Sequence, residues 1–482
     1  MLSSLVPATA GYAAQAKPNI IIVMPDDAGY GDYACLGNPI IRTPAVDAFK
    51  QQGLLLKQFH VSASCAPTRA SLLSGKHEFK NGVTHTIFER ERMSLETVTL
   101  PQVLKTAGYT TGIFGKWHLG DEEAYRPENR GFDEVYGHGG GGIGQTYPGS
   151  CGDAPGNNNI DPTFWHNGSF VKTKGYCTDL LFTQALQWIS HKRSADQPFF
   201  AFIALNAAHT PLVVPKNYYQ HYLGKPGVTE DVAKFYGMIE NIDTNFGVLL
   251  AKLTEWQIAD NTVVIYLGSD NGGFAPATKV FNAGMRGSKM TPYQGGTRVP
   301  CFLRWPAGGV PAGMESDALT TTYDLFPTLA TVAGAAFPDR VKQQVEGRDL
   351  GPLLKNPKAE WPERTLIRHI GRWAKGKAAS AKYNGCAVQN SRFTLVNNTE
   401  LYDLSQDPGE KNNVIGEYPE VAADLRRSYD HWWNEIQPDL INENAIGPKI
   451  NPFKELYWKQ FGGGPTEAEL KAMDPYSTTL PH

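Results

Sequence analysis

The chain has 482 residues, 41% of them hydrophobic and 19% charged, as in ordinary soluble globular proteins, and it can form a large core plus a smaller domain, or two to three domains. Its formal net charge of −3 argues against a nucleic-acid partner, which normally requires a basic excess, so any anionic substrate must be held by a few local cations. The 49 Gly and 33 Pro favour turns and loops over a helical bundle, and no apolar run approaches the ~18 to 20 residues of a membrane span.

The first residues are small and weakly apolar and end at Ala14-Gln15-Ala16, a pattern like a signal-peptidase site. The charged region that normally precedes such a site is missing. We expect residues 1–16 to be a partial export signal, which predicts a periplasmic or secreted protein. A disordered N-terminus is the alternative.

Apolar strands then alternate with helical patterns. The first strand is the largely β-branched run 18–24, which ends at Pro25, and such continuous runs are typical of buried parallel strands. Further elements are predicted as helices at 43–53, 69–73, 100–107, 179–190 and 231–256 and as strands at 110–114, 199–204 and 262–267. The alternation predicts an α/β fold with a large, mainly parallel or mixed sheet sandwiched by helices.

The pattern changes after about residue 360. Short strand-like pieces lie at 366–369, 387–388, 392–396 and 400–404, before a helical pattern at 421–436. We therefore predict a main domain over 17–360 and a smaller C-terminal α+β domain over 361–482 with a short antiparallel sheet. The segment after Phe461 is rich in Gly, Pro and Thr and is expected to be a loop or extended arm.

Carboxylates follow two of the predicted strands. Asp26 and Asp27 come directly after the first strand, and Asp270 and Asn271 follow the strand at 262–267. Adjacent carboxylates repel, so both stay ionised only beside a cation or hydrogen-bond donors, although a lone Asp-Asp pair is more often a strand-end turn or helix cap. Together the side chains form an all-oxygen set that favours Ca²⁺, with Mg²⁺ possible, over zinc or copper.

Basic and imidazole side chains also follow strands. Lys116 and His118 lie two residues apart after the strand at 110–114, so in an extended segment they point to the same side. His209 follows the strand at 199–204, and Lys289 lies in an Arg-Gly-Ser-Lys turn. Taken singly, each lysine could be a surface residue and each histidine could be packed in a loop. Ligands bind beyond the carboxyl ends of strands in α/β sheets, so the common placement of these residues predicts a ligand-binding site.

Cys65 opens the run Cys-Ala-Pro-Thr-Arg, in which Arg69 lies four residues further on. From the residues alone, Cys65 is either a small buried side chain or a thiolate whose pKa Arg69 lowers. The run resembles the C-x-P-[ST]-R signature of type I sulfatases of the alkaline phosphatase superfamily. The family's G-K-W-H-L-G, H-x-P and R-G-x-K elements follow in the expected order, with Ala208 in place of a usual Pro.

This resemblance covers the chain from Lys17 to about Trp433. It implies that a maturation enzyme oxidises Cys65 to formylglycine and that the main domain is catalytic. The implied metal ligands are Asp26, Asp27, Asp270, Asn271 and the modified Cys65. The implied catalytic residues are Cys65, Arg69, Lys116, His118, His209 and Lys289.

The same resemblance implies a sulfuric-ester hydrolase. In that family one oxygen of the hydrated aldehyde attacks sulfur. The roles implied here are Asp270 as the base and His209 as the acid that protonates the leaving alcohol. His118 would help to remove a proton before sulfate leaves. We expect sulfated mono-, oligo- or polysaccharides as substrates. The alternatives are a phosphate or phosphonate ester hydrolase of the same superfamily and, if Cys65 is not matured, a non-catalytic glycan-binding protein.

Two further patterns leave alternatives open. The glycine-rich run 137–144 does not connect a strand to a helix, so we expect a loop at the pocket rim rather than a nucleotide site. Candidate sugar contacts nearby, each of which could instead line a loop core, are His138, Gln145, Trp165 and His166. Cys151 and Cys177 flank a loop and either pair or stay reduced.

Overall fold

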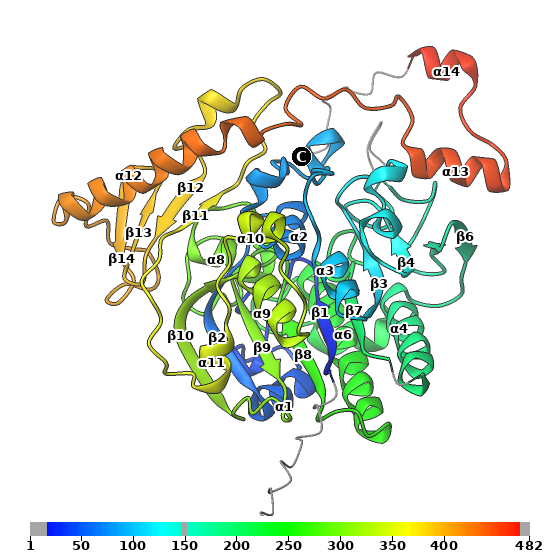
Figure 1. Cartoon of the computed structure of the whole chain (residues 1–482), viewed down its shortest axis with the longest axis horizontal. Helices are drawn as coiled ribbons and strands as arrows, with labels where there is room; N and C mark the ends of the chain where they lie inside the picture. Colours follow the sequence, from blue (N-terminus) through cyan, green and yellow to red (C-terminus); the bar gives the residue numbers. More distant parts are fainter. Residues whose placement is uncertain (1–16, 146–151, 196, 473–482) are drawn as a thin grey trace, which may run out of the picture.

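The computed structural model describes residues 17–145, 152–195 and 197–472 (Figure 1). Its centre is a ten-stranded sheet. In spatial order the strands are β10(Met314–Thr321), β2(Leu54–His60), β9(Arg298–Arg304), β8(Thr262–Leu267), β1(Asn19–Met24), β7(Phe199–Ala204), β3(Thr110–Lys116), β4(Glu134–His138), β5(Thr163–His166) and β6(Ser169–Lys172).

The middle of this sheet is parallel. Strand β1 pairs in parallel with β7 and β8, and β3 pairs in parallel with β7 and β4. Strand β9 is antiparallel to both of its neighbours, and β5 and β6 form an antiparallel edge. The predicted mainly parallel or mixed sheet is confirmed.

Helices cover both faces of the sheet (Figure 1). Ile20 and Ile22 of β1 belong to one apolar core, whereas Ile21 and Val23 belong to the other, because successive side chains of a strand point to opposite faces. The first core includes residues of α2(Cys65–Ser74), α3(Leu100–Thr106) and α9(Leu325–Val332), and the second includes residues of α1(Pro44–Gln52), α4(Cys177–Ser194) and α6(Glu230–Glu255). Burial on both faces explains why β1 reads as a continuous apolar run.

A second, smaller sheet follows in the chain. Its antiparallel strands are β11(Leu366–His369), β12(Cys386–Gln389), β13(Phe393–Val396) and β14(Glu400–Asp403). Trp432 and Trp433 of α12(Pro419–Glu435) are buried in a core that β12 and β13 share. The predicted short antiparallel sheet is confirmed, while the boundary at residue 360 stays a prediction.

The C-terminal segment differs from the expectation of a loop or arm. Helix α13(Pro452–Phe461) ends where that segment begins, and after a glycine-rich connection residues 467–472 form α14(Glu467–Ala472), which the prediction missed. The Thr466 hydroxyl and amide both donate to Glu469, so a capping interaction and good helix formers outweigh the local glycine content. The predicted signal at 1–16 lies outside the described residues.

Shorter helices lie in the connections. They are α5(Lys216–Tyr219), α7(Ala275–Thr278), α8(Gln294–Thr297), α10(Asp339–Gln344) and α11(Gly351–Lys355), with 3-10 turns between them. In the described part of the chain, no helix has both the length and the apolar composition that a membrane crossing requires.

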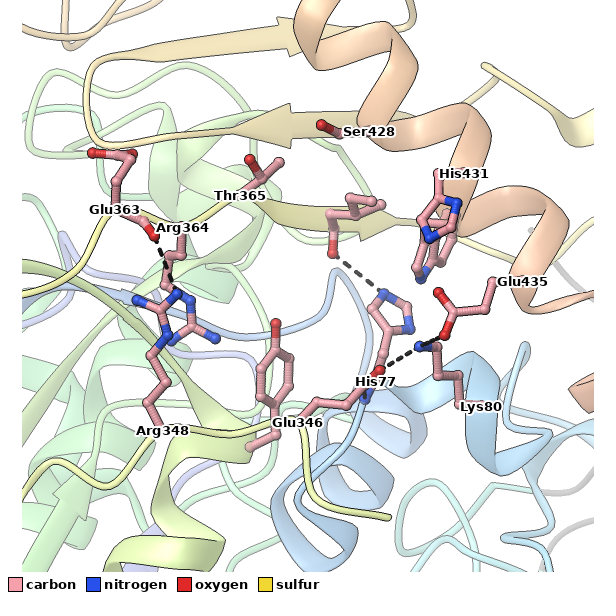
Figure 2. A pocket seen from close by; sticks show the side chains of 13 residues that line it. His77, Lys80, Glu346, Arg348, Glu363, Arg364, Thr365, Ser428, His431 and Glu435 are labelled. Carbon is pink, nitrogen blue, oxygen red and sulfur yellow. Dashed lines mark hydrogen bonds and ion pairs between the residues drawn. The ribbon is translucent and has the colours of Figure 1, made fainter. Parts of the chain in front are cut away.

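A cavity of about 580 Å³ lies where the second sheet meets the main one (Figure 2). Its walls include Tyr323, Trp432 and His431. The charged groups in it pair within the chain: Lys80 contacts Glu346 and Glu435, and Arg364 contacts Asp324. None of the residues predicted for the functional site lines this cavity.

Candidate active site

The predicted site residues converge at the carboxyl edge of four adjacent strands. Asp26 and Asp27 follow β1, Asp270 and Asn271 follow β8, and His209 follows β7. Lys116 is the last residue of β3. Because β8, β1, β7 and β3 are neighbours in that order, residues far apart in sequence meet at one edge, where α/β folds bind ligands.

Helix α2 brings in Cys65 and Arg69. All ten of its residues are buried, and Cys65 begins its first turn. Arg69 lies one turn later, so both side chains point to one side of the helix. The helix is fixed from behind, since the Thr68 hydroxyl accepts a hydrogen bond from the Ser62 amide (2.9 Å) and the Ser62 hydroxyl donates to Glu78 (2.5 Å).

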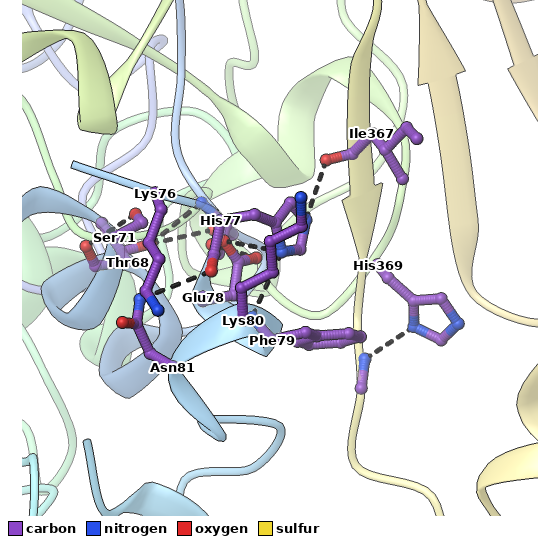
Figure 3. A network of polar contacts seen from close by, with 12 residues as sticks. Thr68, Ser71, Lys76, His77, Glu78, Phe79, Lys80, Asn81, Ile367 and His369 are labelled. Carbon is purple, nitrogen blue, oxygen red and sulfur yellow. Dashed lines mark hydrogen bonds and ion pairs between the residues drawn. The ribbon is translucent and has the colours of Figure 1, made fainter. Parts of the chain in front are cut away.

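The turn after α2 ties it to the second sheet (Figure 3). His77 Nε2 lies 3.2 Å from the carbonyl oxygen of Ile367 in β11, and His77 Nδ1 accepts from the Phe79 amide at 3.2 Å. The helix that carries Cys65 is thus held by both sheets.

Arg69 and Asp270 form a fully buried ion pair. Arg69 Nε and Nη2 donate to Asp270 Oδ2 at 2.9 and 2.7 Å, and Arg69 Nη1 donates to the Lys116 carbonyl at 2.7 Å. The side-chain Nδ2 of Asn271 donates to Asp270 Oδ1 at 2.7 Å. Removing both charges from water is costly, and the Coulomb attraction repays it only in such tight geometry.

Two lysines neutralise the first carboxylate pair. Lys116 Nζ lies 2.6 Å from Asp26 Oδ2, with both side chains fully buried, and Lys289 Nζ lies 2.5 Å from Asp27 Oδ1. Burial opposes the charged form of Lys289, but the Asp27 carboxylate raises its pKa, and Cys65 in its ionised form would add to that effect.

The cluster is short of positive charge near Asp270. Burial would raise the pKa of Asp26, yet Lys116 and its cationic neighbours hold that pKa well below the ordinary value. For Asp270, burial and the charge of Asp26 raise the pKa well above the ordinary value in spite of Arg69. An additional cation would stabilise both carboxylates in the ionised form.

The donor set fits a divalent metal ion. Asp26 Oδ1 and Asn271 Oδ1 are buried and find no hydrogen-bond partner within the described residues. Atoms of Asp26, Asp27 and His209 lie within 4.8 Å of one another. His209 was not among the predicted metal ligands, yet it lies in this group with two of them. The predicted ligand set of Asp26, Asp27, Asp270, Asn271 and Cys65 stays a prediction.

The two histidines lie under the glycine-rich loop. Burial and then Lys289 lower the pKa of His209 to about 4, and its Nδ1 lies 2.7 Å from the Thr210 carbonyl. A Cβ atom at Gly141 would lie 3.0 Å from His118 Cε1, and one at Gly142 would lie 3.1 Å from His209 Nδ1. A side chain at either position would press on an imidazole ring, so glycine lets the loop lie close against both rings, while its place at a pocket rim stays a prediction.

The structure also shows what the sequence missed around His118. His118 Nε2 lies 2.9 Å from the Thr86 carbonyl oxygen and 3.3 Å from Glu91 Oε2. Burial and then Lys116 lower the pKa of His118. Glu91 lies in a run of alternating charges that resembles a solvated turn, and a backbone carbonyl carries no sequence signal.

The candidate sugar contacts divide into two groups. Trp165 packs against Phe170 and Phe453, and His166 pairs with Glu134 at 2.9 Å. Trp165 therefore lines a local core at the β5 edge, which was the alternative interpretation, whereas His166 is partly exposed and its predicted sugar contact stays untested. By contrast, Gln145 reaches the glycine loop, 2.9 Å from a Cβ built at Gly141. His138 is buried, and neither ring nitrogen has a partner in the part of the chain described.

The possible disulfide stays untested. Cys177 is buried at the start of α4, where its Sγ lies 3.5 Å from Asn159 Oδ1. Cys151 lies outside the described residues.

Comparison with known proteins identifies the family. The sulfatase family model matches residues 18–335. The chain belongs to the sulfatase family. A second model, "N-sulphoglucosamine sulphohydrolase, C-terminal", matches residues 288–433 of this sulfatase.

Individual relatives agree over most of the chain. The sulfatase is 32% identical over 449 residues to N-acetylgalactosamine-6-sulfatase of Canis lupus familiaris, covering 83% of this chain and 82% of the relative. It is 30% identical over 478 residues to human arylsulfatase A, covering 88% and 89%. A solved structure of Ps i-CgsB with k-i-k-neocarrahexaose superposes with a TM-score of 0.76 at 26% identity, covering 92% and 97%. The protein is a sulfatase enzyme.

Proposed function

We propose that this sulfatase hydrolyses sulfate esters of carbohydrates, as mono-, oligo- or polysaccharides. The observation that carries this proposal is the meeting of Arg69, Lys116 and Lys289 with Cys65 and the strand-end carboxylates in a chain whose formal net charge is −3. Such local cations supply the attraction that the whole chain lacks. Relatives named for sugar sulfates, and the oligosaccharide in the Ps i-CgsB structure, support a carbohydrate substrate.

The residues fit two groups that the family implies. Asp26, Asp27, Asp270 and Asn271, with the side chain at position 65, would hold a divalent ion, and the all-oxygen donors favour Ca²⁺, with Mg²⁺ as the second choice, over zinc or copper. Formylglycine, made from Cys65 by a maturation enzyme, supplies a hydrated aldehyde as nucleophile, and the ion supplies positive charge beside it.

The chain's own residues then bind and move protons. Arg69 orients Asp270, while Lys116 and Lys289 stabilise the negative charge on the sulfate oxygens. His209 donates a proton to the leaving alcohol, and the charge of a bound sulfate offsets the lowering effect of Lys289 on the pKa of His209. Asp270 is the candidate base for nucleophile activation, and His118 the group that removes a proton before sulfate leaves.

Two other functions compete with this one. A phosphonate monoester hydrolase of Agrobacterium radiobacter superposes with a TM-score of 0.60 at 19% identity, covering 88% of this chain and 96% of that one; the likeness concerns the fold alone, but it keeps phosphate or phosphonate ester hydrolysis as the second candidate. A non-catalytic glycan-binding protein is the expected outcome where Cys65 is not matured. The partial signal at 1–16 supports a periplasmic or secreted location.

The proposal is tested by mass spectrometry and turnover together. Protein from a host with the maturation enzyme should carry an aldehyde in the Cys65 peptide and release sulfate from sulfated saccharides. Cys65→Ala should retain the fold, followed by circular dichroism, and lose turnover. Wild-type sulfate release by that variant would defeat the mechanism, and faster cleavage of matched phosphate esters would favour the second candidate.

A further inference from the structure

A buried carboxylate beside the candidate active site has no part in the reaction as described so far. Glu91, at the end of η3(Phe88–Glu91), is 3% exposed, and its Oε2 lies 3.3 Å from His118 Nε2. Its charged neighbours in sequence face elsewhere: Arg90 pairs with Glu443 at 2.9 Å, and Arg92 pairs with Glu122. Of this run of alternating charges, Glu91 is the member that contacts a predicted catalytic residue.

The contacts of His118 fix which ring nitrogen carries the proton. The Thr86 carbonyl oxygen lies 2.9 Å from Nε2, and a carbonyl can only accept a hydrogen bond. Nε2 therefore carries the hydrogen and donates it to the Thr86 carbonyl, with the Glu91 carboxylate as a second acceptor. In a neutral imidazole the other nitrogen is then an unprotonated acceptor.

That other nitrogen is available to accept a proton. His118 is 1% exposed, and its Nδ1 is buried without a hydrogen-bond partner among the residues described here. A buried polar atom without a partner costs free energy unless a ligand or reacting group satisfies it. Lys116, at the end of β3, belongs to the same cluster as Cys65.

The surroundings of Glu91 make His118 its main hydrogen-bond partner among the site residues. Burial raises the pKa of Glu91 to about 7, the hydrogen bond and charge of His118 lower it, and Asp121 and Cys65 raise it further. His118 itself faces Lys116 and Glu91. A proton taken up by the His118 ring would thus gain an adjacent carboxylate to stabilise it.

We propose that Glu91 is a positioning residue for catalysis: with the Thr86 carbonyl it holds His118 in the Nε2–H form, so that Nδ1 is the atom that takes a proton from a hydroxyl at position 65. The O–H bond breaks with its electron pair left on oxygen, the proton joins Nδ1, and the imidazolium rests against the Glu91 carboxylate. This inference rests on the proposed function and adds a residue to it.

The tautomer is tested on the wild-type protein without any turnover. In a ¹⁵N-labelled sample near neutral pH, with the His118 signals assigned by their loss in His118→Gln, Nε2 should appear protonated and Nδ1 unprotonated. The reverse assignment would overturn the proposal. Because this readout needs no sulfate release, failure of the proposed function would leave it unchanged.

The catalytic role is tested by graded substitution in matured protein. Glu91→Gln keeps an acceptor oxygen but loses the charge, so kcat should fall about 10-fold, and Glu91→Leu loses both, so kcat should fall about 100-fold, since a positioned proton acceptor contributes a factor on the order of 10²–10⁴ to the rate. In both variants KM should stay within about threefold of wild type, because Glu91 acts on the reaction step. Glu240→Gln is the matched control, because Glu240 of α6 lies 2.8 Å from His221 Nε2 of η6(Gln220–Tyr222) in another carboxylate–imidazole pair. Equal kcat for wild type and Glu91→Leu, or a change confined to KM, would contradict the positioning role.

Discussion

Two buried arginines show how differently the two parts of this sulfatase treat positive charge. Arg69, at the main sheet, pairs with the carboxylate of Asp270. Arg368, on β11 of the second sheet, donates instead to two neutral hydroxyls, Thr297 at 2.6 Å and Thr394 at 3.1 Å. Burial lowers the pKa of Arg368 to about 10, with Glu410 opposing.

The two regions differ in which buried polar atoms lack a hydrogen-bond partner among the described residues. Around Arg69, cations and carboxylates are interleaved, yet oxygens of Asp26 and Asn271 lack partners among the described residues. Around Arg368, Thr297 of α8 and Thr394 of β13 accept from the guanidinium and Gln389 lies 2.8 Å from Gln294, while the atoms left without a partner among the described residues are Arg368 Nε and Glu410 Oε1. The surroundings of Arg69 can therefore bind another charged species, whereas the contacts of Arg368 join the second sheet to α8. Perturbing each should therefore change different measured quantities.

The largest effect is expected at Lys116. Lys116→Met would remove the buried partner of Asp26 (2.6 Å) and one cation from the sulfate pocket. We expect kcat/KM for sulfate release to fall by on the order of 10²–10³ or more. In chelator, where no metal ion compensates Asp26, unfolding free energy should fall by about 3–5 kcal/mol because a buried charge loses its partner. Activity within tenfold of wild type would show that Lys116 is structural.

Bound Ca²⁺ should stabilise the protein through the region around Asp26 and Arg69 and not through the second sheet. In chelator-treated protein, Ca²⁺ at about 100 times its dissociation constant is expected to add about 2.7 kcal/mol to the free energy of unfolding and to restore sulfate release. Mg²⁺ should do less at equal concentration. Thermal unfolding with added ions measures both.

Asp26→Asn should abolish this calcium increment. The matched control is Asp324→Asn, which alters a buried carboxylate paired with Arg364 at 2.7 Å beside the second sheet and should keep the increment. An unchanged increment in Asp26→Asn would place the ion elsewhere.

Most of the catalytic cluster was predictable because strands organise it. Asp26, Asp270 and Lys116 each follow an apolar run, and parallel strands bring such positions to one edge. Glu91 and the Thr86 carbonyl were not predictable, since their contact with His118 depends on how a loop returns across the sheet. The roles assigned to the site residues stay predictions.

The same reasoning explains the fold. Burial on both faces made β1, β3, β7 and β8 readable as apolar runs, so the parallel centre of the large sheet followed from the sequence, as did the smaller antiparallel sheet, whereas the other strands of the large sheet were not predicted. The contact of Arg368 with Thr297 was hidden, because it joins residues 71 positions apart and neither has a local signal. Helix α14 was missed because glycine-rich neighbours outweighed its short run of helix formers.

The second region should respond to pH through Glu410. Burial raises the pKa of Glu410 from 4.5 to about 7, and its carboxylate accepts from the Gln294 amide at 2.8 Å. The folded state thus holds the proton more tightly than the unfolded chain. Its contribution to stability is fully present below about pH 4.5 and is lost as the pH rises through about 7.

Comparison with Glu410→Gln isolates that contribution. Between pH 4.5 and 7 the wild type should lose on the order of 3 kcal/mol more than the variant, measured by urea unfolding across the range. Parallel curves for the two proteins would mean that Glu410 does not titrate on unfolding.

The smallest effect is expected at Arg368. Arg368→Met leaves the hydroxyls of Thr297 and Thr394 without their donor, so unfolding free energy should fall by about 1–3 kcal/mol. The charge that Arg368 lends to Glu410 is also lost, so the pH at which stability falls should move upward. Turnover per folded molecule should stay within about twofold of wild type, because the side-chain hydroxyls that accept from this guanidinium belong to Thr297 of α8 and Thr394 of β13, which are not among the predicted site residues. Loss of turnover at unchanged stability would instead place Arg368 in the catalytic region and remove the contrast between the two arginines.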